Sequence, residues 1–130
     1  MCLELIDPKT KIEKTAKHPL KVYKAFLRKS NKEITGPFFI EYNYASKPIN
    51  TSHSLKKKLV LEYNSIYEGF HSCLTLDDCK KFITKWEWQI PMSLHKNIEY
   101  WECEIPKGAK YYYSDGKYAS TSIKLVRKVK

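Results

Sequence analysis

Residues 98–105 alternate in the manner of a strand, most regularly from Trp101 to Ile105, and this pattern restricts the fold more than any other feature of the chain. The two sets are Trp101, Cys103 and Ile105 on one side, and Tyr100, Glu102 and Glu104 on the other. A period of two is typical of a strand with one face against a core. Pro106-Lys107-Gly108 follows and predicts a turn.

Four further segments carry β-forming residues. They are Leu20–Leu27, the aromatic run 38–44, the segment 109–113 and the final run 121–129. We expect Leu20–Leu27 to be covered on both faces. Turns are predicted at Gly36-Pro37, before the aromatic run, and at Asp115-Gly116, after the segment 109–113. In the final run, Ile123, Leu125 and Val129 are predicted to share one face, with Lys124 and Lys128 on the other. In 109–113, Tyr111 and Tyr113 are predicted to pack inward with Tyr112 outward; stacking of these rings on nucleic-acid bases is the alternative.

One helix is predicted to begin after Thr75. Thr75 is a favourable N-cap, and Asp77 and Asp78 place negative charge at the positive end of the helix dipole. The apolar residues then recur at helical spacing, at Leu76, Cys79, Phe82 and Ile83.

Together these elements predict an α+β fold, a mostly antiparallel sheet with one or two helices packed on it, in a single domain over residues 1–130. The length suits one core, and 42% hydrophobic residues supply enough apolar surface to order the chain. The polar stretch 45–58, which contains Pro48, is predicted to be a loop without structure of its own.

The net charge of +10 is distributed unevenly. Residues 9–32 hold nine basic residues against Glu13, residues 59–104 hold four basic and eight acidic residues, and the last 26 residues hold seven basic residues against Asp115. Such asymmetry indicates an anionic partner, namely a nucleotide, a nucleic acid or an acidic protein surface. The alternative is an ordinary lysine-coated surface, which the scarcity of arginine favours.

Cysteine usage and the N-terminal sequence bear on the compartment. The four cysteines, without a secretory signal or a long apolar stretch, indicate free, partly buried thiols in a reducing compartment. We therefore expect a protein of the bacterial host cytoplasm, with no membrane association.

The densest group of reactive side chains is the segment from Tyr67 to Cys73, just before the predicted helix. It combines Tyr67, Glu68, His71 and Cys73 near a helix N-terminus, a natural anion site. His71 is either a ligand-contacting group or a structural histidine. The spacing of His71, Cys73 and Cys79 does not favour zinc, and motifs for nucleotide or calcium loops are missing, so neither a metal nor a cofactor is expected.

Three segments together resemble a known group. They are GFHSCLTLDDCKKF (69–82), YWECEIPKGAKYYYSDGKYAS (100–120) and SIKLVRKV (122–129). This order resembles a group of uncharacterised small proteins encoded by bacteriophages and by prophages of gut bacteria, and the resemblance implies a phage accessory context.

A more distant similarity is to the ADP-ribosyltransferase fold. It implies that His71 faces a nicotinamide-type pocket and that Lys24 stands where that family often has Arg or His. The family's catalytic Glu is expected near the start of the last strand, where this chain has Ser120, Thr121 and Ser122.

The leading hypothesis is therefore a non-enzymatic, phage-type accessory protein that binds an anionic partner, which is a nucleotide, a nucleic acid or a host defence protein; counter-defence is one role that this would serve. Its candidate ligand-binding residues are Lys24, Arg28, Tyr67, His71 and Tyr112. One alternative is an enzyme acting on NAD, with Tyr67, His71 and Glu104 in the active site. Another is a small virion or assembly component, and the oligomeric state is left open.

Overall fold

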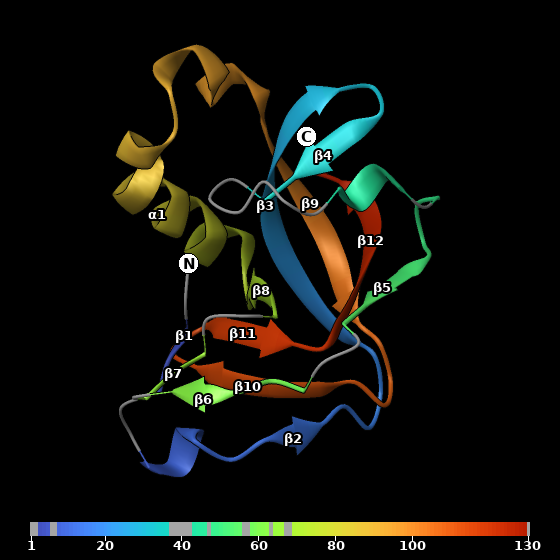
Figure 1. Ribbon diagram of the computed structural model, residues 1–130, viewed down its shortest axis with the longest axis vertical. Coiled ribbons are helices and arrows are strands. Elements are labelled where there is room, and N and C mark those ends of the chain that lie inside the picture. Colours follow the sequence, from blue (N-terminus) through green and yellow to red (C-terminus); the bar gives the residue numbers. More distant parts are fainter. Residues whose placement is uncertain are drawn as a thin grey trace.

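The computed structural model describes residues 3–5, 8–36, 43–46, 48–55, 58–62, 64–66 and 69–129. It confirms the mostly antiparallel α+β architecture (Figure 1). One helix, α1 (Leu76–Trp86), packs against a large sheet. In the described part of the chain, no helix is long and apolar enough to cross a membrane.

The large sheet has the strand order β2-β10-β11-β8-β3-β9-β12-β5, with β4 also paired to β3. Its strands are β2 (Lys14–Thr15), β3 (Leu20–Ser30), β4 (Glu33–Thr35), β5 (Ser52–Ser54), β8 (Phe70–Cys73), β9 (Ile98–Ile105), β10 (Lys110–Ser114), β11 (Lys117–Ser120) and β12 (Ser122–Lys128). The pairings are antiparallel.

The large sheet is strongly bent. In Figure 1, β3, β9 and β12 run upright, whereas β11, β10 and β2 run across them. The main core lies inside this bend, where Phe26 and Trp101 from the upright strands meet Ala109 and Tyr111 from the crosswise part.

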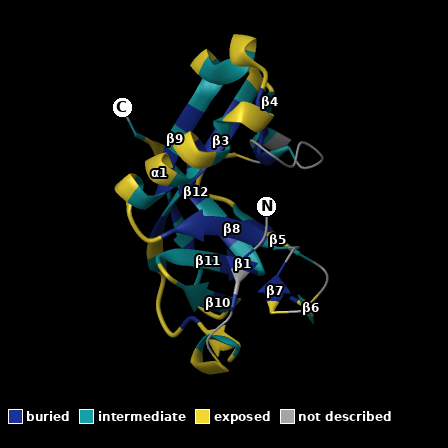
Figure 2. Cartoon of the chain, turned by 90° about the vertical axis from the view of Figure 1, so that its left-hand side faces the viewer, coloured by how far each residue is buried: buried dark blue, intermediate teal, exposed yellow. Residues whose placement is uncertain are grey.

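The opposite face of the large sheet is covered by two elements. Over β3 and β9 lies α1, which inserts Cys79 and Ile83 against Ala25 and Cys73. Beside β10 and β11 lies a small antiparallel sheet of β1 (Leu3–Glu4), β7 (Ser65–Ile66) and β6 (Leu61–Glu62). Figure 2 shows β8 as buried and β10 and β11 as mostly intermediate, with exposed residues along α1 and at the lower end of the molecule.

Short 3-10 turns complete the chain: η1 (Pro8–Thr10), η2 (Tyr44–Ser46), η3 (Glu87–Gln89) and η4 (Met92–Asn97). The turns η3 and η4 form the tryptophan-containing connection between α1 and β9.

Three sequence predictions of local structure are confirmed. Residues 98–105 form β9 with every second residue buried. The covered strand begins at Leu20 as expected but extends to Ser30. Thr75 caps α1, because its hydroxyl accepts a hydrogen bond of 3.1 Å from the Asp78 backbone N–H.

The predicted loop over residues 45–58 is wrong in its centre. Residues 52–54 form the edge strand β5, which pairs with β12 and buries His53 to 1% exposure. The segment is too polar to show a strand pattern, and only its position beside β12 gives it backbone partners.

Most of the aromatic run 38–44, and Pro37 before it, lie outside the described residues. Its last residue, Tyr44, lies in η2 rather than in a strand. The Asn43 side chain explains this local turn, since its Oδ1 accepts from the backbone N–H groups of Ile34 and Ala45, both at 3.0 Å. The chain reverses earlier than predicted, at residues 31–32, to form β4.

Two predicted side-chain directions are also wrong. A bulge in β12 between Leu125 and Arg127 shifts the register, so Lys128 pairs opposite Trp101 and reaches Glu99, away from the face of Lys124. Tyr112 points inward and is 8% exposed, because the small sheet covers the face that the sequence predicted to be free.

Candidate anion-binding surface

Lys24 and His71 are the two predicted site residues that the fold brings together. The pairing of β3 with β8 is confined to Tyr23 opposite Cys73. Beyond that point the Lys24 ammonium donates a hydrogen bond to the His71 backbone carbonyl. The aliphatic stem and ammonium of Lys24 are buried, with the rings of Phe26 and Tyr44 about 6 Å away. Burial lowers the pKa of Lys24.

The His71 ring is enclosed by backbone carbonyls. Its Nδ1 lies 3.2 Å from the Gly69 oxygen and its Nε2 lies 3.1 Å from the Ile66 oxygen. Burial, reinforced by the nearby Lys24 ammonium, lowers the pKa of His71 to about 4. His71 is therefore neutral at physiological pH. Its position resembles that of a structural histidine more than that of a ligand-contacting one.

Two cavities lie near these residues. One of about 30 Å³ is lined by Lys24, His71, Cys73 and Cys79, among others, and has room for one or two water molecules. A larger one of about 230 Å³ lies between the β3–β4 hairpin, η2 and β5, and Arg28 is among its lining residues.

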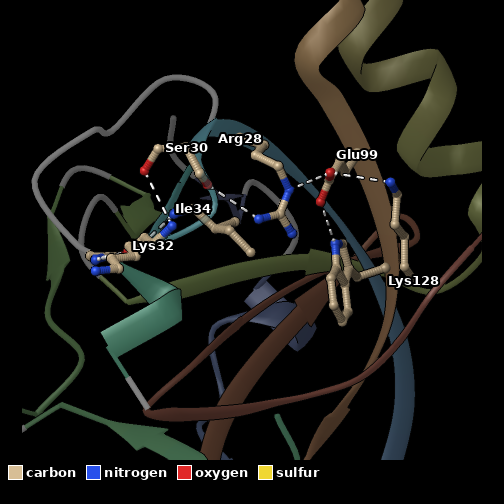
Figure 3. A network of polar contacts seen from close by, with 8 residues as sticks. Arg28, Ser30, Lys32, Ile34, Glu99 and Lys128 are labelled. Atoms are coloured by element: carbon tan, nitrogen blue, oxygen red, sulfur yellow. Dashed lines mark hydrogen bonds and ion pairs between the residues drawn. The ribbon is translucent and has the colours of Figure 1, made fainter. Parts of the chain in front are cut away.

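Arg28 belongs to a polar network centred on Glu99 (Figure 3). Its Nε lies 2.6 Å from the Glu99 carboxylate, which also receives hydrogen bonds from Trp101 Nε1 at 3.1 Å and from Lys128 at 3.2 Å. Arg28 also donates to the Ser30 carbonyl at 3.2 Å. Burial raises the pKa of Glu99, but the three hydrogen bonds outweigh it, and the net pKa is lowered. Arg28 is thus already paired within the fold.

The remaining predicted site residues lie elsewhere. Tyr112 packs between the two sheets, with Leu3, Leu5 and Ile66, and Tyr67 lies outside the described residues. Glu104 forms an ion pair with Lys124 at 3.1 Å on the opposite end of β9. From the strand registers, His71 and Glu104 are two strands and about four residues apart, roughly 15 Å. The fold therefore does not unite His71 and Glu104 in one site.

Part of the charge asymmetry seen in the sequence is compensated by ion pairs in the fold. The glutamates of β9 come from the acidic middle of the chain and pair with cations from both ends. These cations are Lys21, Arg28, Lys124, Arg127 and Lys128. The strand order places β9 between β3 and β12, and this explains the pairing.

The lower end of the molecule in Figure 1 is formed by the N-terminal segment and β2 beside β10, and these segments carry a different group of lysines. The N-terminal segment 8–17 runs along β10 and the turn before it. Ala16 exchanges backbone hydrogen bonds with this turn: its N–H donates to the Ala109 carbonyl at 2.9 Å, and its carbonyl accepts from Gly108 at 2.8 Å. Lys14 pairs opposite Tyr111, and the Lys110 ammonium donates to the Thr15 hydroxyl.

We call this end the basic end and define it by residues 8–17 and 106–110. These two segments hold six lysines and one acidic residue, Glu13. The lysines are exposed except for the partly buried Lys11; they are Lys9, Lys11, Lys14, Lys17, Lys107 and Lys110. β2 is the last strand of the large sheet on this side, so the surface is open.

Comparisons with protein-family models, with curated proteins and with solved structures found no match for this chain. Function is therefore inferred from the residues and their geometry.

Sequence reasoning missed Lys107 and Lys110 as members of the same surface as Lys14. The two segments are about ninety residues apart, and only the β2–β10 pairing joins them. The sequence showed that each segment is basic. That the two segments lie side by side depends on the order of strands in the sheet. The tyrosines of β10 and β11 support the packing interpretation, since Tyr111 and Tyr118 are half-buried against the main core.

Proposed function

We propose that this protein is a non-enzymatic binding protein whose basic end contacts the phosphate backbone of nucleic acid without reading its sequence. The observation that carries the proposal is the meeting of six lysines, from two distant segments, around a single acidic residue. Lysine ammoniums neutralise phosphates and release counterions, and this electrostatic gain supplies most sequence-independent affinity.

An extended polyanion suits this surface better than a single nucleotide. The lysines lie on the segment 8–17, which includes the edge strand β2, on the turn before β10 and at the start of β10. They do not line either of the two cavities described above. The basic end also contains no Arg, Asn or Gln, whose planar groups make bidentate contacts with base edges, whereas the lysine ammonium is a compact point charge. This composition favours contact with the backbone over contact with the bases.

The cellular setting is part of the same proposal. The motifs in residues 69–129 resemble those of phage accessory proteins, and a small basic protein of that kind would sit on DNA or RNA in the host cell, where defence proteins also act. Counter-defence by occupying nucleic acid is consistent with a protein that carries out no chemistry.

The proposal is tested by fluorescence anisotropy with a labelled duplex, a labelled single strand and polyglutamate as a competing polyanion. If about four lysines contact phosphates, the affinity for duplex DNA is expected to fall by about 10²-fold between about 50 and 200 mM salt. A duplex of unrelated sequence should bind equally well.

Two triple variants with the same change in net charge provide the control. Lys14→Gln/Lys107→Gln/Lys110→Gln alters the basic end, and Lys81→Gln/Lys85→Gln/Lys96→Gln alters exposed lysines around α1 and η4. The first should reduce the salt slope by about three, and the second much less. Equal losses in both variants, no binding at low salt, or binding to polyglutamate but not to DNA would overturn the proposal.

A further inference from the structure

Two thiols face each other where β8 meets α1. Cys73 is the last residue of β8, and Cys79 lies in the first turns of α1, beyond the Thr75 cap. Both belong to the small core cluster between the helix and the sheet, with exposures of 7% and 3%. Both side chains also line the same small cavity.

The surroundings give the two thiols different acidities. The hydrogen bond from Cys79 lowers the pKa of Cys73, and the Lys24 and Lys117 ammoniums lower it further against the opposing effect of burial. The pKa of Cys79 is raised, because it donates that hydrogen bond and is itself buried. Cys73 is the sulfur that becomes a thiolate more readily, and the thiolate is the reactive form of cysteine.

A small oxidant can reach this pair through space that already exists. Cys73 and Cys79 line the cavity of about 30 Å³, together with Phe82 and Lys117. Such a cavity admits molecules of about the size of water. Cys103 is a natural contrast. It is fully buried, it is not among the residues of this cavity, and burial raises its pKa to about 12.

We propose that Cys73 and Cys79 form a redox-active pair that hydrogen peroxide converts to an intramolecular disulfide. The Cys73 thiolate attacks one peroxide oxygen, the O–O bond breaks, and Cys73 becomes a sulfenic acid while hydroxide leaves. The Cys79 sulfur then attacks the Cys73 sulfur, the S–O bond breaks, and water leaves with the Cys79 proton. The two thiols lose two electrons, which reduce the peroxide.

The disulfide joins the end of β8 to α1 across the helix cap. It closes a short loop and restricts the unfolded chain, so the oxidised protein is expected to unfold at a temperature several degrees higher than the reduced protein. This inference does not depend on the proposed binding function.

The test uses the full chain with Cys2→Ser, which removes the fourth thiol. The folded protein is treated with hydrogen peroxide, remaining thiols are alkylated in denaturant, and tryptic peptides are analysed by mass spectrometry. Cys73 and Cys79 fall in one tryptic peptide, residues 59–80, and Cys103 falls in another, residues 97–107. We expect the first peptide to lose two hydrogens, reversibly with dithiothreitol, while the second keeps a free thiol.

Single variants separate the two roles. Cys79→Ser should leave a sulfenic acid at Cys73 that dimedone traps, whereas Cys73→Ser should leave Cys79 unlabelled under the same conditions. Circular dichroism verifies that both variants fold. A disulfide to Cys103 or between two chains, equal dimedone labelling of both variants, or resistance of the folded protein to peroxide would overturn the proposal.

Discussion

The buried His71 ring makes stability depend on pH in a way that can be calculated. Its ring nitrogens face the carbonyls of Gly69 and Ile66, and the Lys24 ammonium lies close to it. Burial first, and Lys24 second, lower the pKa of His71 from 6.5 to about 4. The perturbation is His71→Gln, which keeps a polar side chain at the site but removes the titrating group.

The sign follows from proton binding. Between pH 6.5 and 4 the unfolded chain binds a proton at His71 that the folded protein excludes, so acidification favours unfolding. The stabilising contribution of the neutral ring is complete above 6.5 and is lost as the pH falls towards 4. With about 1.4 kcal/mol for each pH unit, the loss between about pH 7.5 and about pH 5.5 is about 1.4 kcal/mol.

Urea unfolding at these two pH values, for the wild type and for His71→Gln, measures this quantity. The wild type should lose about 1.4 kcal/mol more than the variant over this interval, whatever the absolute stability of the variant. NMR titration of the His71 ring in the wild type gives an independent value. An identical pH dependence in both proteins, or a His71 ring that titrates near its ordinary pKa of 6.5, would refute the reasoning.

Two further substitutions test the packing of the fold. Glu99→Gln is expected to lower the free energy of unfolding by about 2 kcal/mol, because hydrogen bonds between charged groups are lost at a largely buried carboxylate. The control is Lys81→Gln, which removes an exposed ion pair with Asp77 and should change the free energy of unfolding by less than about 0.5 kcal/mol. Since the pKa of Glu99 is lowered in the folded protein, the stability that the carboxylate contributes is present above the unfolded pKa of 4.5 and is lost as the pH falls through the folded pKa. Equal urea midpoints for the two variants would contradict the stabilising role of Glu99. Gly69→Ala, at a φ of +111° with the new Cβ 2.7 Å from Leu59 Cδ2, should cost about 2 kcal/mol or more, while Gly108→Ala, at a φ of +90° with no atom within 4 Å, should cost only the backbone strain of about 1 kcal/mol. Thermal unfolding of both glycine variants checks the order, and a larger loss at Gly108 would be inconsistent with it.

Charge pairing across β9 changes how the basic character of the chain should be understood. Part of the positive charge is paired within the sheet, because Glu99, Glu102 and Glu104 form ion pairs with cations of β3 and β12. The positive charge of the basic end is confined to one part of the surface. It arises from two segments that are each only modestly basic. We therefore expect the protein to contact an anionic partner through this end of the molecule, in a salt-dependent way.

Local patterns in the sequence were enough to determine several elements correctly. The alternation in residues 98–105 predicted a strand with one buried face, and the Thr75 cap with its acidic first turn predicted that a helix begins there. These signals depend on residues close together in sequence, whose backbone geometry and capping hydrogen bonds are local. The free, buried state of Cys73, Cys79 and Cys103 also agrees with what cysteine usage predicted.

Tertiary structure decided what depends on distant partners. The edge strand around His53 forms only because β12 offers it backbone hydrogen bonds, and Tyr112 is buried only because a small sheet from other parts of the chain covers it. The bulge in β12 turned Lys128 towards Glu99, which no periodicity could show. Sequence by itself determined β3, β9, β10, β12, the start of α1 and the total charge. The order of strands in the sheet determined which charges pair, because pairing across a sheet joins residues that the chain keeps far apart.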